Sequence, residues 1–375
     1  MTPRVLLVIT KGEAGGAQTH VAELCQAIGQ RATFTAVVGG EGPSPLGDAM
    51  TTLGVPTTHL PSLRNSLNPL RLWPAVHALL GLIRAQQPHV IHAHSAVAGV
   101  IARIAGKISQ TPVVYTVHGF GFKPHAPRLI RYNAWLAEAL LAAWTTRMVC
   151  VSHFERQLAR QLPLDPERVS VVHNALADVP WLSQPGTEPA SLVMVARMAA
   201  PKRPDLLLQA LHQLAGQGLA PATHLLGGGP TLAVQQQHAQ DLKLPHVHFA
   251  GDVPNVAEQL AQHQIFVLLS DHEGLPISVL EAMRSGLAIV ASRLPGVEEL
   301  ITDGEHGLLV PNEPQAIARA LQRLLRDAAL RQRLGQAARQ RYLQAFQPQA
   351  MADQLMGIYE EAPLLPTGTW PMTLP

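Results

Sequence analysis

At 375 residues the chain exceeds the length that one hydrophobic core usually serves, which predicts two domains. A formal charge of +2 at pH 7, with only 14% charged residues, gives no reason to expect a nucleic-acid partner. The two cysteines, Cys25 and Cys150, fit neither a disulfide framework nor a zinc site, and both lie in apolar segments where burial is expected.

The first residues are predicted to form a strand rather than a signal peptide. Their apolar core covers only residues 5–9, and no small-residue cleavage pattern follows it. No later apolar run reaches the roughly 18 residues that a membrane-spanning helix needs. We therefore expect a cytoplasmic protein, with peripheral contact at the inner face of the membrane as a further possibility to test.

The first half of the sequence alternates between strand and helix. Short apolar runs rich in β-branched residues are typical of buried parallel strands, and a turn at residues 11–18 opens a helix that extends to about residue 29. Further helices are predicted at 70–85 and 97–107. The rhythm predicts a doubly wound parallel sheet with right-handed crossovers. The predicted strands are 4–9, 33–38, 56–60, 89–92, 112–116, 148–151 and 169–172.

Residues 174–190 interrupt this rhythm with three prolines and a glycine, which predicts a linker. After it the rhythm restarts and predicts a second doubly wound domain. We place the domains at 1–178 and 190–345, and expect the helix and tail of 346–375, Pro-rich from Ala362, to pack back on the first domain. The predicted strands of the second domain are 192–195, 223–226, 247–249, 265–269 and 288–291.

Two carboxylates mark the segment 270–283, which joins the strand at 265–269 to a helix. Glu273 precedes the helix and Glu281 lies inside it, while Pro276 suits its first position. Ligands of open α/β sheets bind at the carboxyl ends of strands, and the amides of a helix start favour anions. Eight residues of helix span about 12 Å, so these carboxylates cannot share a proton. Hydroxyl binding suits Glu281. For Glu273, the alternative to a role in ligand binding is that its negative charge is simply favoured by the start of the helix.

Arg197 and Lys202 flank a proline-containing turn after the strand at 192–195. A guanidinium fork and a flexible ammonium suit a diphosphate, although two solvated surface charges are an equal alternative. The run Gly227-Gly228-Gly229-Pro230 ends the next strand, where it either lets a ligand come close or forms a simple turn.

Gly15 and Gly16 lie at the first strand-to-helix turn, where backbone amides can approach a phosphate or where the pair only makes a tight connection. The fuller G-x-G-x-x-G signature is missing, which disfavours a nicotinamide cofactor. His118 precedes a loop of glycine and aromatic residues at the sheet edge, where loops carry function. His92 and His94 alternate onto one face of a strand end, but no third ligand at usable spacing supports a metal.

Basic and aromatic residues gather in the first half of the chain. Such a surface can meet an anionic membrane or a lipid phosphate, and the alternative is a solvated face over core aromatics. The residues are Arg64, Arg71, Trp73, Phe120, Phe122, Lys123, Arg128, Arg131, Tyr132 and Trp135.

In their order and spacing these motifs resemble the family 4 retaining glycosyltransferases of GT-B architecture, and the wording around His118 and Glu273 is most similar to bacterial polysaccharide-assembly enzymes. Ala175 stands where the family usually has glycine, and Gly228 replaces a common Asp. The matching segments are 15–20, 116–119, 151–152, 172–174, Arg197 with Lys202, 227–230, and 273–281 followed by Gly286.

The resemblance implies two Rossmann-like domains facing a cleft, 1–178 on the acceptor side and 190–345 binding a nucleotide sugar. Arg197 and Lys202 would hold the donor diphosphate, and Glu281 would bind the ribose. Glu273 and His118 would contact the donor sugar. The remaining candidate donor-binding residues are Gly15, Gly16, Gly227, Gly229, Gly274, Leu275 and Pro276.

The function expected from the resemblance is retaining transfer of a sugar from a nucleoside diphosphate to a saccharide or lipid-linked saccharide, in cell-surface polysaccharide biosynthesis. The cationic side chains and helix-start amides would take the place of a metal, so no cofactor is expected beyond the nucleotide sugar as co-substrate. No carboxylate is clearly placed as a nucleophile, which favours a same-face displacement. The alternatives are a nucleotide-sugar epimerase or phosphorylase on the same fold, or a non-catalytic nucleotide-sugar-binding protein.

Overall fold

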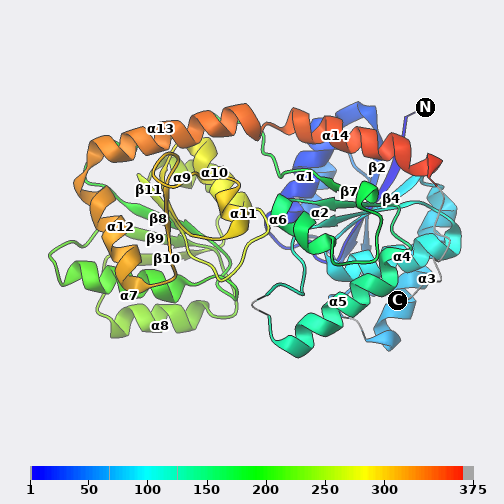
Figure 1. Cartoon of the computed structure of the whole chain (residues 1–375), viewed down its shortest axis with the longest axis horizontal. Coiled ribbons are helices and arrows are strands. Elements are labelled where there is room, and N and C mark those ends of the chain that lie inside the picture. The colour runs from blue at the N-terminus through cyan, green and yellow to red at the C-terminus, as the bar shows by residue number, and fades with distance from the viewer. Residues whose placement is uncertain (1, 67, 125, 366–375) are drawn as a thin grey trace. The chain divides into compact units, whose positions relative to one another are not determined.

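The structure is a computed structural model that describes residues 2–66, 68–124 and 126–365. The chain divides into two compact units, and each is described by itself (Figure 1). The first unit comprises residues 1–175 and returns with residues 348–375, while the second comprises residues 176–347. The predicted tail beyond residue 365 lies outside the described residues.

Within the described ranges, the first unit is built on a 7-stranded sheet in the order β3-β2-β1-β4-β5-β6-β7. All neighbouring strands are parallel; Leu7, for example, pairs with Ala36 on one side and His92 on the other. The strands are β1 (Arg4–Ile9), β2 (Thr33–Gly39), β3 (Thr57–Leu60), β4 (Val90–His94), β5 (Val113–Val117), β6 (Arg147–Cys150) and β7 (Val169–Val171).

Helices cover both faces of this sheet, because successive strand residues point to opposite sides. Val5, Leu7 and Ile9 of β1 pack with α1, α2 and α14, whereas Leu6 and Val8 pack into the core on the other face, with α3 and α4. The helices are α1 (Gly16–Ile28), α2 (Pro45–Thr52), α3 (Pro69–Gln86), α4 (Ala96–Ser109), α5 (Arg128–Ala142), α6 (His153–Ala159) and α14 (Pro348–Glu361), with 3-10 turns at Gly29–Arg31, Pro166–Arg168 and Ala362–Leu364.

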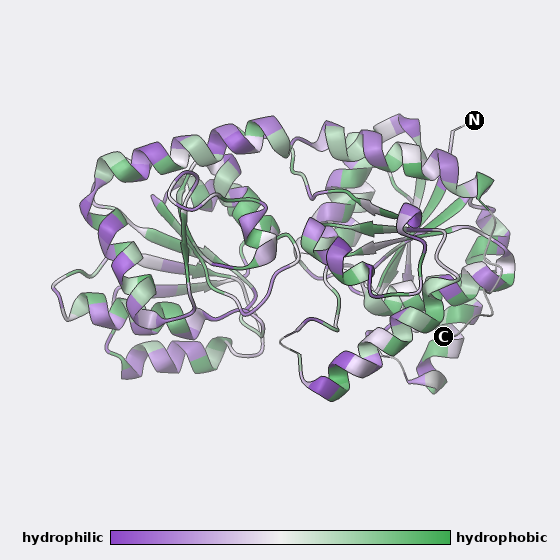
Figure 2. Ribbon diagram, in the orientation of Figure 1, coloured by the Kyte–Doolittle hydropathy of each residue, from purple (hydrophilic) through white to green (hydrophobic). Residues whose placement is uncertain are grey.

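The second unit has a 6-stranded sheet in the order β10-β9-β8-β11-β12-β13, again parallel throughout the described residues. Most strand residues in both sheets are apolar, as their green colour in Figure 2 shows. The strands are β8 (Leu192–Val195), β9 (Thr223–Leu226), β10 (Val247–Gly251), β11 (Ile265–Leu268), β12 (Ala288–Ser292) and β13 (Leu308–Val310). The helices are α7 (Pro204–Ala215), α8 (Leu232–Asp241), α9 (Val256–Ala261), α10 (Ile277–Ser285), α11 (Pro295–Glu298), α12 (Pro314–Arg326) and α13 (Ala328–Ala345).

The two doubly wound parallel sheets confirm the predicted fold class. Sequence reasoning missed β13, whose three apolar residues are too few to show a period. It also placed Pro276 one position too far into the helix. Pro276 is the N-cap of α10, with extended backbone dihedrals, and the first helical residue is Ile277. No helix in the described part of the chain is long and apolar enough to cross a membrane.

Candidate active site

Several of the predicted site residues follow the strands at which each sheet changes its direction of winding. In the first unit, β1 and β4 are neighbours although three connections separate them in the chain, and β8 and β11 are the corresponding pair in the second. Ligands of doubly wound folds bind outside the carboxyl ends of such strands. Gly15 and His94 follow or end the first pair, while Lys202 and Glu273 follow the second.

The loop after β8 is held against the segment after β11 by backbone contacts. Lys202 and Ser270 form an isolated antiparallel bridge, the N–H of Asp271 donates to the carbonyl of Pro201 at 3.0 Å, and the N–H of Arg203 donates to that of Leu269 at 2.9 Å. The positions of Lys202 and Glu273 relative to each other are therefore fixed by the backbone.

Nζ of Lys202 lies 2.5 Å from Oε1 of Glu273, and the two side chains are 19% and 11% exposed. Nearby, the Arg203 guanidinium binds Asp205 and Asp271, which raises the pKa of Arg203, chiefly through its hydrogen bonds to Asp205. The site thus holds an ion pair that a ligand can reach and a second charged network that fixes the loop.

Three residues that sequence reasoning did not single out position the segment that carries Glu273. Ser292 on β12 accepts a hydrogen bond from the N–H of Ser270 at 3.0 Å, and Asn312 donates to the carbonyl of Ser270 at 2.9 Å. A Cβ on Gly296 would lie 2.0 Å from the carbonyl oxygen of Gly274, so only glycine fits there. These contacts come from a strand, a helix and a loop that follow in the chain, and no local motif marks them.

The glycines after β9 serve the backbone of the loop that carries Arg197. Gly227 and Gly229 have φ values of 127° and 147°, which disfavour any side chain. A Cβ on Gly227 would lie 2.2 Å from the carbonyl oxygen of Ala196, and one on Gly229 would lie 2.5 Å from that of Met198. The close approach is therefore to the backbone of residues 196–198, and Arg197, whose side chain is exposed, lies at its centre.

Gly274, Leu275 and Pro276, which lead into α10, are buried. Glu281, in the second turn of the helix, is half-buried. Glu273 lies in the loop before the helix, so the two carboxylates belong to different elements. The structure therefore presents Glu273 beside Lys202 and places Glu281 further along α10.

In the first unit, Gly15 is the N-cap of α1 and Gly16 its first residue. A Cβ on Gly15 would meet only the flexible end of the Gln18 side chain, so packing alone does not demand glycine there. The hydroxyls of Thr10 and Ser95 lie 2.8 Å apart and join the ends of β1 and β4. His20, in the second turn of α1, lies near His94, with their ring centres 5.5 Å apart.

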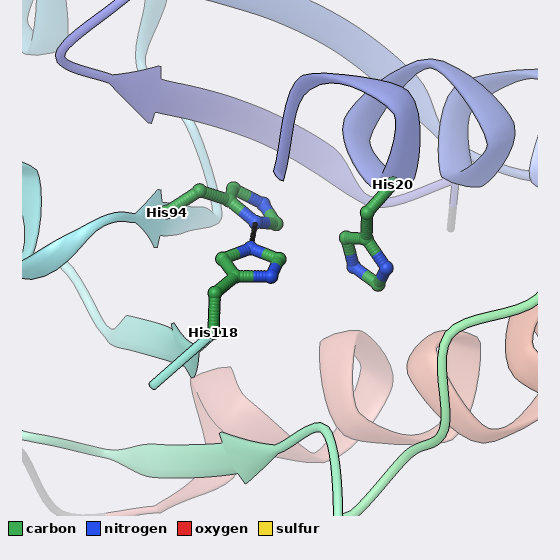
Figure 3. A group of neighbouring side chains, drawn as sticks. All are labelled: His20, His94 and His118. Atoms are coloured by element: carbon green, nitrogen blue, oxygen red, sulfur yellow. Dashed lines mark hydrogen bonds between the residues drawn. The ribbon is translucent and has the colours of Figure 1, made fainter. Parts of the chain in front are cut away.

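Three histidine rings gather at this edge of the first sheet (Figure 3). His94 ends β4, His118 follows β5, and His20 points toward both from α1. Nδ1 of His94 lies 3.2 Å from Nε2 of His118, and the His20 ring centre is 5.1 Å from that of His118. Sequence reasoning found no third partner for the His92 and His94 pair, because His20 and His118 lie far from them in the chain.

Burial keeps these rings neutral at physiological pH. It lowers the pKa of His20 to about 4, an effect that the neighbouring Asn174 side chain opposes. Burial and the adjacent imidazoles lower the pKa of His94 and of His118 well below the usual value. A neutral ring offers one donor and one acceptor, which suits sugar hydroxyls or a metal ion.

The loop after His118 is pinned by a buried ion pair. Nζ of Lys123 lies 2.6 Å from Oε1 of Glu155, and the N–H of Phe120 donates to Oε2 of Glu155 at 3.0 Å. Phe120, Phe122 and Lys123 are all buried. The inclusion of these three residues in a basic and aromatic surface was therefore wrong, because the loop folds inward around Glu155.

Two family models match the chain and together cover most of it. The model "Glycosyltransferase Family 4" matches residues 14–178, and "Glycosyl transferases group 1" matches residues 182–341. The chain belongs to the family 4 glycosyltransferases, enzymes that transfer a glycosyl group from a nucleotide sugar.

Relatives and solved structures agree with this placement. The O-antigen biosynthesis glycosyltransferase WbnH of Escherichia coli is 27% identical, over 85% of this chain and 89% of its own. The E. coli UDP-Gal:alpha-D-GlcNAc-diphosphoundecaprenol alpha-1,3-galactosyltransferase is 26% identical, over 72% and 75%. The structure of Anabaena Alr3699/HepE in complex with UDP-glucose has a TM-score of 0.81 at 20% identity and covers 96% of this chain and 100% of its own. It shares the GT-B fold.

Proposed function

We propose that this glycosyltransferase uses a nucleoside-diphosphate sugar, UDP-sugars being the first to test, and retains the configuration of the anomeric carbon without a metal ion. The acceptor is a saccharide or lipid-linked saccharide in cell-surface polysaccharide assembly. The observation that carries the proposal is the ion pair of Lys202 and Glu273 at the switch point of the second sheet. Relatives named for O-antigen biosynthesis and for UDP-galactose transfer support the substrate class.

We assign the cations to the leaving group. Lys202 and Arg197 neutralise the diphosphate, aided by backbone amides at Gly274 and Leu275 and at Gly15 and Gly16. The Lys202 ammonium is paired with Glu273, so the fold already fixes the position of a cation that can meet the diphosphate.

The remaining side chains orient the sugar nucleotide. Glu273 and the neutral ring of His118 hydrogen-bond hydroxyls of the donor sugar, and Glu281 binds the ribose hydroxyls. Pro276 shapes the start of α10, while Gly227 and Gly229 keep Arg197 in position. The roles of Glu273, His118 and Glu281 use the hydrogen-bonding capacity of their side chains.

The chemical step is a same-face displacement. The bond between the anomeric carbon and the phosphate oxygen breaks, and the acceptor hydroxyl oxygen bonds to the anomeric carbon from the same side. The acceptor proton passes to the departing phosphate, whose charge Lys202 and Arg197 stabilise. Glu273 acts on the sugar's hydroxyls and forms no covalent intermediate.

A membrane surface is the proposed location of a lipid-linked acceptor. Helix α5 exposes Leu129, Ile130 and Tyr132, with 73%, 58% and 59% of each side chain accessible, and the exposed Arg128 and Arg131 lie beside them. Apolar side chains next to cations suit an anionic bilayer, which accepts the former and attracts the latter.

The test begins with a panel of nucleotide sugars, in which the donor is the compound that raises the melting temperature of the full chain. Transfer to a saccharide acceptor is then followed by NMR of the new glycosidic linkage. We expect the donor's anomeric configuration in the product and loss of the thermal shift in Lys202→Ala. An inverted linkage would overturn retention, and the absence of a shift with every nucleotide sugar would overturn the donor assignment.

A further inference from the structure

The histidine cluster of the first unit has the geometry of a metal site. One ring nitrogen from each of His20, His94 and His118 can be chosen so that the three lie within 4.8 Å of one another. Nδ1 of His94 and Nε2 of His118 are 3.2 Å apart. In a tetrahedral site with metal–nitrogen bonds of about 2.0–2.1 Å, ligand nitrogens are about 3.3 Å apart.

The donor set decides which ions fit. Three imidazoles form the cluster, and they are already in the neutral form that binds a metal. Hard ions such as Mg²⁺ and Ca²⁺ prefer oxygen ligands, whereas imidazole suits Zn²⁺ and its first-row neighbours. Three histidines with a fourth position for water make an accepted zinc arrangement.

His92 fixes the orientation of His94 and is not itself a ligand. Its Nδ1 lies 2.6 Å from the Tyr359 hydroxyl and its Nε2 lies 2.7 Å from the Thr116 hydroxyl, so both ring nitrogens are occupied. The ring centre of His92 is 4.1 Å from that of His94. This packing helps to hold the His94 imidazole in place.

We propose that His20, His94 and His118 form a binding site for a Zn²⁺-class divalent ion. An ion at this site takes no part in the metal-free transfer step. The site does share the His118 ring with the proposed donor-sugar site, so a bound ion would make that ring unavailable to the sugar. The site is therefore inhibitory rather than catalytic, a consequence that alone rests on the proposed function.

The test measures binding in the full chain, so its result does not depend on the role of His118 in transfer. Zn²⁺ stoichiometry is determined by competition with a chromogenic chelator, and Co²⁺ is used as a spectroscopic probe. We expect the wild type to bind one more Zn²⁺ per chain than His94→Ala and than His118→Ala, and to give the intense visible absorption of tetrahedral Co²⁺.

The exposed His77 on α3 provides the matched control, because His77→Ala removes an imidazole outside the cluster. His118 is only half-buried, so its replacement is expected to disturb the fold less than that of the buried His94. If His94→Ala unfolds, His118→Ala alone is compared with the wild type. Equal stoichiometry in the wild type, His118→Ala and His77→Ala would overturn the proposal, as would a Co²⁺ spectrum of six-coordinate type.

Discussion

Nζ of Lys123 and Oε1 of Glu155 form an ion pair at 2.6 Å while their side chains are only 6% and 0% exposed. Glu155 also accepts the N–H of Phe120, two residues beyond His118. The pair therefore ties the loop that carries His118 to α6, and the loop's geometry depends on a charge that has no access to water.

Removing one member of this pair is expected to destabilise the first unit. Lys123→Met leaves a buried carboxylate without its cation, which costs about 3–5 kcal/mol of unfolding free energy. The double variant Lys123→Met/Glu155→Gln should recover part of the loss, because a neutral amide can still accept from Phe120. Urea unfolding of both variants measures the difference, with Lys107→Met on exposed α4 surface as the control. Equal stability of the two Lys123 variants would contradict the account.

Lys202 is expected to matter in the transition state as well as in donor binding. Lys202→Ala should lower kcat/KM by about 10²–10³-fold, because charge develops on the leaving diphosphate. Glu273→Gln should also impair transfer, through the donor sugar. Steady-state kinetics with the identified donor measure both, and Arg326→Ala on exposed α12 controls for loss of a cation. Loss of transfer in Lys202→Ala alongside wild-type activity in Glu273→Gln would refute the assigned roles.

Adding divalent metal ions is expected to change the transfer rate in the opposite sense from that of a metal-dependent transferase. A chelator should leave the transfer rate unchanged, since Lys202 and Arg197 supply the positive charge. Added Zn²⁺ should slow transfer by binding at the histidine cluster, and the chelator should restore the rate. A requirement for added divalent metal, abolished by the chelator, would show that the metal-free mechanism is wrong.

Acid is expected to destabilise the second unit through His263. Its pKa is lowered by burial and by His224, whose Nδ1 lies 2.9 Å from Nε2 of His263. The folded state therefore keeps the ring neutral, while the unfolded state binds a proton below its ordinary pKa of about 6.5. The contribution of the neutral His263 ring to the free energy of unfolding is therefore fully present above about pH 6.5. It is lost as the pH falls from about 6.5 toward the lower pKa of the folded state.

The variant His263→Gln isolates this effect. Its melting temperature should fall less steeply than that of the wild type between about pH 7.5 and pH 5, even if it starts lower. His238→Gln on α8 serves as the comparison. Parallel curves for the wild type and His263→Gln would remove His263 from the explanation.

Anionic liposomes are expected to sediment part of the protein, and Arg128→Ala/Arg131→Ala should reduce that fraction. The physical reason is the attraction of lipid phosphates to the two cations beside the exposed apolar side chains of α5. Arg319→Ala/Arg323→Ala removes the same charge from exposed positions on α12 and should leave sedimentation unchanged. If both double variants sediment as the wild type does, α5 is not the contact surface.

Most strands and several helices could be predicted from the sequence, because buried parallel strands appear as short apolar runs and helices as periodic apolar positions. The predicted strand at 4–9 coincides with β1, and the predicted strand at 192–195 with β8. Lys202 and Glu273 could be singled out because each follows a strand in a local motif. Their pairing was not predicted, because it depends on β8 and β11 being neighbours, which local sequence does not reveal.

The histidine cluster is a second case in which local sequence does not reveal which residues meet in the fold. Alternation on one strand was enough to relate His92 to His94, but the two differ in role because Tyr359 and Thr116 take both nitrogens of His92. His20 and His118 join the cluster from other elements. The basic and aromatic surface was partly wrong for a related reason: composition does not show which side of a loop faces the core.

Helix α14 contributes Met351, Leu355 and Tyr359 to the same core as β1 and α1, although it is translated after the whole second unit. The whole second unit is therefore synthesised before α14. Until α14 is made, the apolar side chains that it covers on one face of the first unit's sheet stay exposed to water. The second unit can finish folding first, and the first must wait in a partly open state. The core of the first unit is therefore completed only by a helix that follows the second unit in the chain.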